Sequence, residues 1–227
     1  MKLSLLRREI DEIDSQIVSL FVKRSQIVHK VKELKDSRAE KSGEYHLHIK
    51  PDREFDVIAN VLNLAKDSLF SCKFFFHTWR GVISASNFLE QNLSLVATCD
   101  ASKYSLFEYY AMQKQVEIDK TQAAFAKIET NDAHILAFHK SNAEAFEFLK
   151  KSKKITIFAQ SSGDTFLCGK VLTPYFASPA LAVTLNPSQI VINKEAGVFA
   201  SENIDDICQA SCIGAFYPYW TPSVTSV

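Results

Sequence analysis

The sequence LSLLRREIDEIDSQIVSLFVKRSQIVHKVKELK, residues 3–35, decides how the first third of the chain folds. It contains no Gly or Pro, and its apolar residues recur at alternating steps of four and three, which predicts one long amphipathic helix. Such a helix would be about 50 Å long, more than a small monomeric domain can cover, so a second copy of the chain is the simplest partner. The apolar seam consists of Leu6, Ile10, Ile13, Ile17, Leu20, Ile27, Val31 and Leu34.

One position of this seam is a cation. Arg24 follows Leu20 on the apolar stripe, and a buried guanidinium needs a partner because an unpaired buried charge is very costly. An ion pair across a helical dimer and a ligand site explain this residue equally well. Lys35 lies about 20° from Arg24 in helical phase and roughly 16 Å further along the axis, so both side chains can face one elongated cavity. Arg7 is rotated from Arg24 by about 100°, so only the Arg7 of a partner chain can easily serve that cavity.

Two more helices are predicted before residue 92. A polar loop over Asp36–Lys50 precedes a helix that begins at Pro51, and a third helix covers residues 72–91. Both helices carry polar residues on their apolar faces, although helix capping or simple exposure could explain each one singly. Taken together with the cations of the first helix, they suit a buried site for a small dianion. These residues are Glu54, Ser86 and Glu90.

The three segments resemble the AroQ class of all-helical chorismate mutases. The resemblance covers about residues 3–91, and it implies a three-helix domain over residues 1–92 that forms an intertwined homodimer. It also implies an intramolecular isomerase that rearranges chorismate to prephenate, in phenylalanine and tyrosine biosynthesis, without cofactor or metal. The motifs are Leu6-Arg7-Arg8-Glu9-Ile10 with Ile13-Asp14, then Ile49-Lys50-Pro51-Asp52-Arg53-Glu54, and Val82-Ile83-Ser84-Ala85-Ser86 with Glu90.

The resemblance implies three catalytic residues. Arg24 would bind a substrate carboxylate, while Lys35 would contact a carboxylate and the ether oxygen of the breaking bond. Glu90 would donate a hydrogen bond to the same ether oxygen, at a position where several members of the family have Gln. A carboxylate cannot donate, so Glu90 would have to stay protonated. We therefore expect a rate that falls as pH rises through neutrality.

Four further residues would bind the substrate, again by resemblance. The partner subunit's Arg7 would bind a carboxylate together with Arg24, and Ser86 would contact a carboxylate as well. Glu54 would hold the ring hydroxyl, and Arg53 would support that region. An Asp common in the family, three residues before the conserved Arg, is Lys50 in this chain, which weakens the expected contact to the hydroxyl.

Residues 93–227 are predicted to form a smaller α/β domain, because short apolar runs alternate with helical stretches. The Ser102-Lys103-Tyr104-Ser105 turn and the strand before it are faintly similar to the catalytic region of prephenate dehydratases. Thr165-Phe166, however, lacks the Arg of that family's Thr-Arg-Phe signature. We interpret the region as a reduced, non-catalytic relative that binds a regulator or supports the dimer. The expected strands are Leu93–Cys99, Ala133–Phe138, Ile155–Ala159, Val183–Leu185 and Gln189–Ile192, and the expected helices are Leu106–Gln113, Ala143–Lys150 and Ile204–Cys212.

The composition excludes several classes of function. Lys plus Arg and Asp plus Glu both number 26, so no field of one sign favours nucleic acid or a membrane surface. The N-terminus has no uncharged apolar run, and the scattered cysteines fit a reducing, cytoplasmic setting. The pair His46 and His48 lies in a polar loop without a third ligand nearby, so we expect no metal site.

The resemblance implies chorismate as the small-molecule substrate. Three functions other than that of a chorismate mutase alone stay open. One is a bifunctional chorismate mutase and prephenate dehydratase. Another is an isochorismate pyruvate lyase, which shares the helical scaffold. The third is a non-enzymatic helical module for dimerisation or regulation. A module of that kind has no reason to keep Lys35 and Glu90 in phase with Arg24, and this favours an enzyme.

Overall fold

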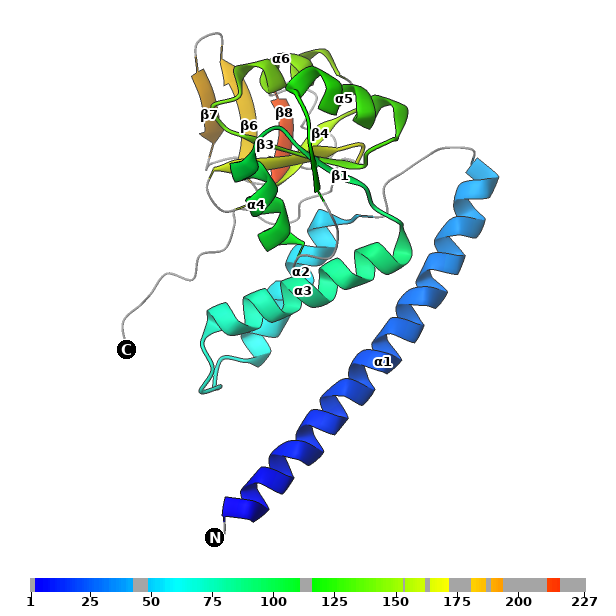
Figure 1. Cartoon of the computed structure of the whole chain (residues 1–227), viewed down its shortest axis with the longest axis vertical. Coiled ribbons are helices and arrows are strands. Elements are labelled where there is room, and N and C mark those ends of the chain that lie inside the picture. Colours follow the sequence, from blue (N-terminus) through cyan, green and yellow to red (C-terminus); the bar gives the residue numbers. More distant parts are fainter. Residues whose placement is uncertain are drawn as a thin grey trace.

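The chain forms a helical region followed by a mixed β-sheet with helices on both faces (Figure 1). This computed structural model confirms the predicted order, a helical N-terminal region and then an α/β region. None of the helices in the described ranges is both long and apolar enough to cross a membrane. The structure describes residues 3–42, 49–110, 116–152, 154–161, 164–171, 181–186, 189–193 and 212–216.

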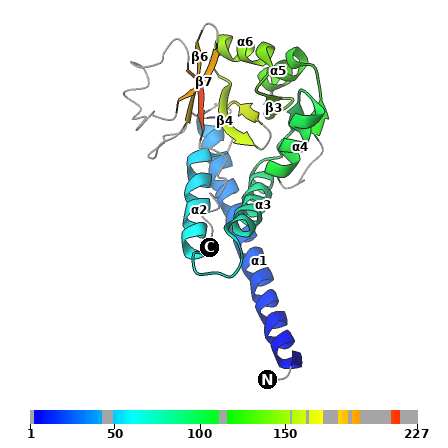
Figure 2. The ribbon, with the colours of Figure 1, turned by 90° about the vertical axis from the view of Figure 1, so that its left-hand side faces the viewer.

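Helix α1, Leu3–Ser42, is a single unbroken helix of 40 residues. Its C-terminal half passes α3, whereas its N-terminal half projects beyond the rest of the molecule (Figures 1 and 2). The apolar seam is therefore largely exposed: Ile13 is 54% and Leu20 is 65% accessible, and among the apolar residues between Leu3 and Ser37 only Val28 is buried. Within one chain, most of this seam has no partner.

The polar loop predicted over Asp36–Lys50 is wrong in its first half, because α1 continues to Ser42. No Gly or Pro occurs before Gly43, and the segment is rich in residues that favour helix. An ion pair one turn apart, with Lys32 Nζ 2.8 Å from Asp36 Oδ2, also supports the extension. His46 and His48 lie outside the described residues.

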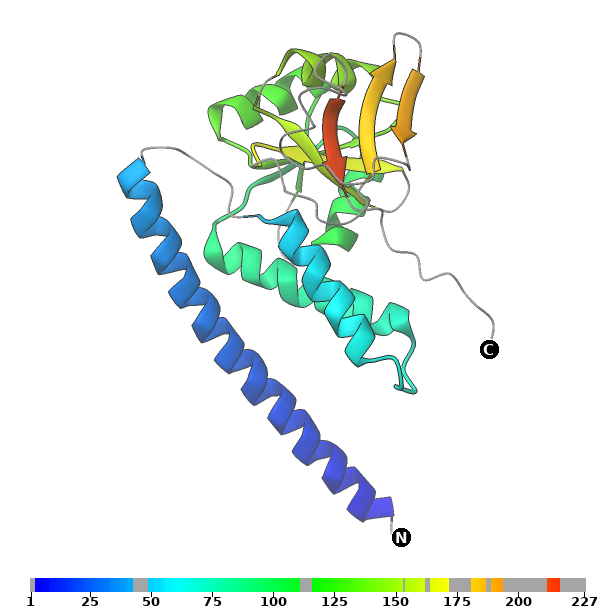
Figure 3. The ribbon, with the colours of Figure 1, turned by 180° about the vertical axis from the view of Figure 1, so that it is seen from behind.

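Helices α2, Pro51–Leu64, and α3, Cys72–Glu90, form a hairpin (Figure 3). Pro51 occupies the first turn of α2, where its missing N–H costs nothing. Ser71 caps α3 by accepting a hydrogen bond from the Phe74 backbone N–H at 3.3 Å. The two helices bury a small apolar cluster that contains Ile58, Phe76 and Ile83.

The sheet has the order β2-β1-β3-β5-β4-β8-β6-β7. Strands β1, β2 and β3 are mutually parallel where they pair, β5 runs antiparallel between β3 and β4, and β8 is parallel to β4. The pair β6 and β7 is an antiparallel ribbon at the far edge, next to β8. The bounds are β1 Leu95–Ala97, β2 Val116–Ile118, β3 Ile135–His139, β4 Thr156–Ser161, β5 Thr165–Gly169, β6 Leu181–Asn186, β7 Gln189–Asn193 and β8 Cys212–Phe216.

Alternate residues of β3 point to opposite faces of the sheet and fill two cores. Leu136 and Phe138 belong to the core under helices α5, Thr121–Thr130, and α6, Ala143–Lys151. Ile135 and Ala137 belong to the core under helix α4, Asp100–Tyr109, which faces the helical hairpin. Both cores are fully buried within this one chain.

Several elements of the α/β region differ from the prediction. The helix expected over 106–113 begins earlier, at Asp100, because Cys99 and the following polar residues start it, and residues 111–115 are outside the described ranges. Of the helix expected over Ile204–Cys212, residues 204–211 lie outside the described ranges, and Cys212 begins strand β8. Strands β2 and β5 and helix α5 were not expected, because their apolar runs are short or interrupted.

The change from helices to strands falls between Glu90 and Leu95. The two regions nevertheless share a core, since Ile49 and Leu93, which flank the hairpin, are buried in one cluster with Leu106 and Tyr110. The division into domains at residues 92 and 93 stays a prediction.

Candidate active site

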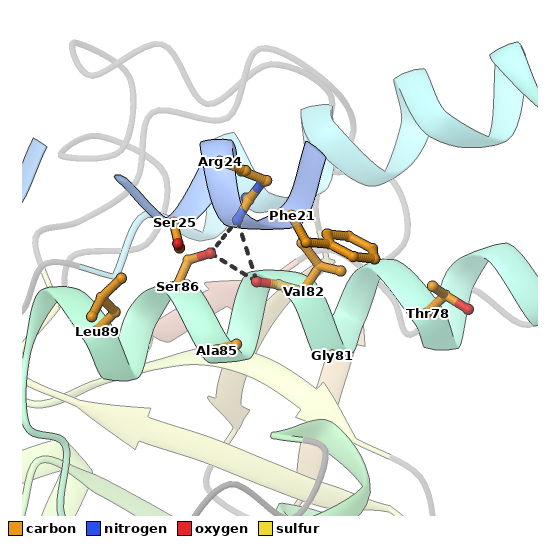
Figure 4. A pocket seen from close by; sticks show the side chains of 9 residues that line it. All are labelled: Phe21, Arg24, Ser25, Thr78, Gly81, Val82, Ala85, Ser86 and Leu89. Atoms are coloured by element: carbon orange, nitrogen blue, oxygen red, sulfur yellow. Dashed lines mark hydrogen bonds between the residues drawn. The ribbon is translucent and has the colours of Figure 1, made fainter. Parts of the chain in front are cut away.

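A cavity of about 460 Å³ lies where α1 crosses α3 (Figure 4). Its walls are mainly apolar, and Arg24 is the one cation among the residues that line it. A small ligand would therefore meet one fixed positive charge among apolar side chains. The lining residues are Phe21, Arg24, Ser25, Thr78, Gly81, Val82, Ala85, Ser86 and Leu89.

Arg24 reaches from α1 to the polar edge of α3. Its Nη1 donates hydrogen bonds to Ser86 Oγ and, at 3.5 Å, to the carbonyl oxygen of Val82 (Figure 4). The Ser86 hydroxyl in turn donates to the Val82 carbonyl at 2.7 Å, so its lone pairs face the guanidinium. Burial lowers the pKa of Arg24, and the carboxylate of Glu90 partly offsets this. Arg24 and Ser86, which were each predicted to contact a substrate carboxylate, are thus in direct contact with one another.

Lys35 forms an ion pair with Glu90 one helical turn beyond Ser86 on α3. The Glu90 side chain is only 13% exposed, and its charge also acts on Arg24. The structure therefore brings Arg24, Lys35, Ser86 and Glu90 together along one contact between two helices. Lys35 Nζ donates to Glu90 Oε2, so in the unliganded protein Glu90 acts as a hydrogen-bond acceptor toward Lys35.

Glu54 lies apart from the residues that line the cavity, and its predicted contact with the ring hydroxyl of the substrate stays a prediction. It is buried between α2 and α3, where Oε2 accepts from Arg80 Nη2 at 2.7 Å and Oε1 accepts from Asn87 Nδ2 at 2.8 Å. Glu54 does not line the cavity, although Asn87 is the neighbour of Ser86 on α3. Burial by itself would lower the pKa of Arg80, but the charge of Glu54 and the adjacent Tyr109 raise it above its ordinary value.

The remaining two predicted residues, Arg7 and Arg53, are exposed. Arg53 stands in the first turn of α2. Arg7 lies in the N-terminal half of α1, seventeen residues before Arg24 and therefore about 25 Å from it along the helix axis. Neither residue belongs to the group of predicted site residues that meet where α1 contacts α3. Their roles in substrate binding stay predictions.

Arg80, Asn87 and Tyr109 are the residues that the sequence-based prediction missed. The sequence did contain a signal for Arg80: it is a cation on the same stripe of α3 as the apolar residues Phe76 and Ile83. Glu54 on an apolar stripe of α2 similarly required a buried cation opposite. Tyr109 gave no comparable signal, since it reaches α3 from another region of the chain.

The chemistry that this contact can support is binding and polarising an anion. It offers a guanidinium, an ammonium, a hydroxyl and a carboxyl group beside an apolar cavity, and these groups can bind carboxylates and donate to a developing negative oxygen. Within the described ranges, no cluster of His, Cys, Asp and Glu has the composition of a metal site.

A helical hairpin crossed by a long helix, with the Arg24 guanidinium facing a small apolar cavity, defines a helical domain with a candidate anion-binding site. Residues 6–91 match the family model for chorismate mutase type II. The match confirms that this N-terminal segment is similar to chorismate mutases of type II, as its motifs predict. No curated protein and no solved structure matches the chain. The likeness of the following region to prephenate dehydratases has no support from these comparisons and stays a prediction.

Proposed function

We propose that this protein catalyses the rearrangement of chorismate to prephenate at the contact between α1 and α3. The observation that carries this proposal is the meeting of Arg24 with Ser86, and of Lys35 with Glu90, inside the segment that matches the family. Chorismate is a small dianion with an apolar ring, and the cavity beside Arg24 combines a cation with apolar walls.

The reaction is an intramolecular [3,3] shift, so the protein needs only to hold the compact conformer and stabilise charge on the departing ether oxygen. Arg24 would bind a carboxylate, with Ser86 assisting. Lys35 would turn from Glu90 to the substrate and donate to the ether oxygen. Glu90, relieved of its ion pair, would take up a proton and donate to the same oxygen.

The complete site is proposed to need a second copy of the chain. Arg7 is about 25 Å from Arg24 along α1, so the partner subunit's Arg7 would supply the second carboxylate contact. The exposed seam of α1 supports a homodimer, because exposed apolar stripes of this length are otherwise a liability in solution. A role in phenylalanine and tyrosine biosynthesis, and a cytoplasmic location, are part of the same proposal.

The test is an assay of the purified chain with chorismate and, separately, with isochorismate. We expect conversion of chorismate, with kcat/KM about 100- to 1,000-fold lower in Arg24→Ala, because one preorganised donor to a developing charge contributes that much. Lys23→Ala is the matched control: it removes the neighbouring cation of α1, which is exposed, and should change the rate less than about twofold.

Three results would contradict the proposal or redirect it. A wild type without turnover on chorismate would leave a non-enzymatic helical module. Release of pyruvate from isochorismate alone would identify a lyase on the same scaffold. Equal rates in the Arg24→Ala and Lys23→Ala variants would remove Arg24 from the site.

A further inference from the structure

The α/β region contacts the helical hairpin through the C-terminal end of α4. Tyr109 and the adjacent Tyr110 lie against α3, where the Tyr110 ring packs edge-on to Phe88 with centroids 5.8 Å apart. Ser84 Oγ of α3 donates to the backbone carbonyl oxygen of Tyr109 at 3.2 Å. Side chain and backbone of α4 are therefore both attached to the helix that carries Ser86.

Tyr109 contacts Arg80 in two ways. The guanidinium lies over the aromatic ring, 4.4 Å from its centroid, and Arg80 Nη1 donates to the Tyr109 hydroxyl at 3.3 Å. A cation desolvated against an aromatic face is attracted by the ring quadrupole. Arg80 has few alternatives, since its Nε has no hydrogen-bond partner within the described residues and its side chain is only 5% exposed.

The same guanidinium holds Glu54. Nη1 of Arg80 is directed to Tyr109 while Nη2 donates to Glu54 Oε2, so the direction of one contact fixes the direction of the other. A planar guanidinium transmits orientation in this manner because its donors cannot rotate independently. Glu54 on α2 is thereby tied to a tyrosine of the α/β region.

The position of Tyr109 is itself fixed by the sheet. Helix α4 packs on β1 and β3, and its Leu106, one turn before Tyr110, is fully buried in the core beneath them. A shift of Tyr109 would therefore require movement of a helix embedded in that core. The sheet therefore restrains the Glu54 carboxylate through α4, Tyr109 and Arg80.

We infer that Tyr109 is a positioning residue of the helical site, which sets the orientation of the Glu54 carboxylate through Arg80. For its effect on turnover this inference rests on the proposed function and on the role that the family resemblance implies for Glu54, which is to hold the ring hydroxyl of the substrate. It gives the α/β region a definite task, which is to keep α2 and α3 in the arrangement that the substrate needs.

The experiment is a double-variant cycle on the full chain with chorismate. Tyr109→Leu removes the ring and the hydroxyl, and we expect kcat/KM to fall about tenfold or more, in line with the loss of a hydrogen bond to a charged group. Tyr109→Phe keeps the ring over Arg80 and should lose about threefold, which distinguishes local repositioning from a failure to fold. Tyr104→Leu is the control, since Tyr104 is on the same helix but 70% exposed.

The decisive comparison is between Glu54→Gln and Glu54→Gln combined with Tyr109→Leu. If Tyr109 acts through Glu54, the second change adds less than about twofold to the loss from the first. Losses that multiply would overturn the inference, because they would show a general structural role. A Tyr109→Leu variant with the same kcat/KM as the wild type would overturn the inference as well.

A wild type inactive on chorismate would refute the proposed function and leave the positioning inference to be judged by stability. In that case the wild type, Tyr109→Leu, Glu54→Gln and the double variant are compared in urea unfolding. A combined shift of the midpoint smaller than the sum of the separate shifts would support a coupled Glu54, Arg80 and Tyr109 unit. Additive shifts would overturn it.

Discussion

Helix α1 and the α/β sheet bury their apolar residues to opposite degrees. The sheet buries Ile135, Leu136, Ala137 and Phe138 completely between helices of the same chain. In α1 the apolar seam is equally regular, yet most of it remains exposed. The difference teaches that the described core of the sheet is covered within one chain, whereas most of the α1 seam is left uncovered there, which supports the proposed homodimer.

The largest expected effect tests the completeness of the sheet. Phe138→Ala should lower the free energy of unfolding by about 3–5 kcal/mol, because it opens a cavity in a closed core. Leu20→Ala, an equally apolar deletion on exposed α1, should cost little at protein concentrations where the chain is monomeric. Urea unfolding at low concentration measures both, and equal losses would mean that α1 is already covered within one chain.

The second prediction tests the missing half of the α1 interface. Ile13→Asp places a charge in the middle of the projecting seam, and we expect the dissociation constant of the dimer to rise at least about 100-fold, because an unpaired buried carboxylate is costly. Chorismate turnover should fall with it, since the partner subunit's Arg7 is lost.

Light scattering over a dilution series provides the measurement. The matched control is Ile118→Asp on β2, where an isoleucine of similar exposure, 45%, stands on the sheet region. That variant should assemble as the wild type does. A wild type that stays monomeric at all concentrations would remove the argument for a second copy.

The smallest expected effect concerns the carboxyl group between α1 and α3. If Glu90 must be protonated to donate, kcat/KM should fall about tenfold per pH unit as pH rises through neutrality. Gln donates at every pH, so Glu90→Gln should flatten the profile. Glu33→Gln, which removes an exposed acid of α1, should leave the profile unchanged. A wild-type rate independent of pH would rule the mechanism out.

Local periodicity made the helical region predictable. The steps of four and three in α1 mark its apolar stripe whether or not another element covers it, and the helical phase of Arg24 and Lys35 places both beside α3. The end of α1 was less predictable, because Asp36–Ser42 is polar but contains no residue that stops a helix. Polarity indicates exposure and does not by itself end a helix.

The network around Glu54 could not be predicted in the same way. Its partners come from α3 and α4, and the contact of Arg80 with Tyr109 joins residues 29 apart in the sequence. The short strand β2 was missed for a related reason: a run of three residues has no visible period, and only its pairing with β1 defines it. Interactions of this kind depend on the tertiary arrangement, which one sequence does not reveal.

The projecting half of α1 has a consequence for the rate at which its amide protons exchange with solvent. In a dilute chain the hydrogen bonds of residues 3–20 have little packed against them, so they should open and exchange quickly, while those of β3 exchange slowly. Raising the concentration should slow exchange in α1 and leave β3 unchanged. A deuterium map recorded at two concentrations would thus mark, amide by amide, the boundary between what one chain folds and what two chains fold together.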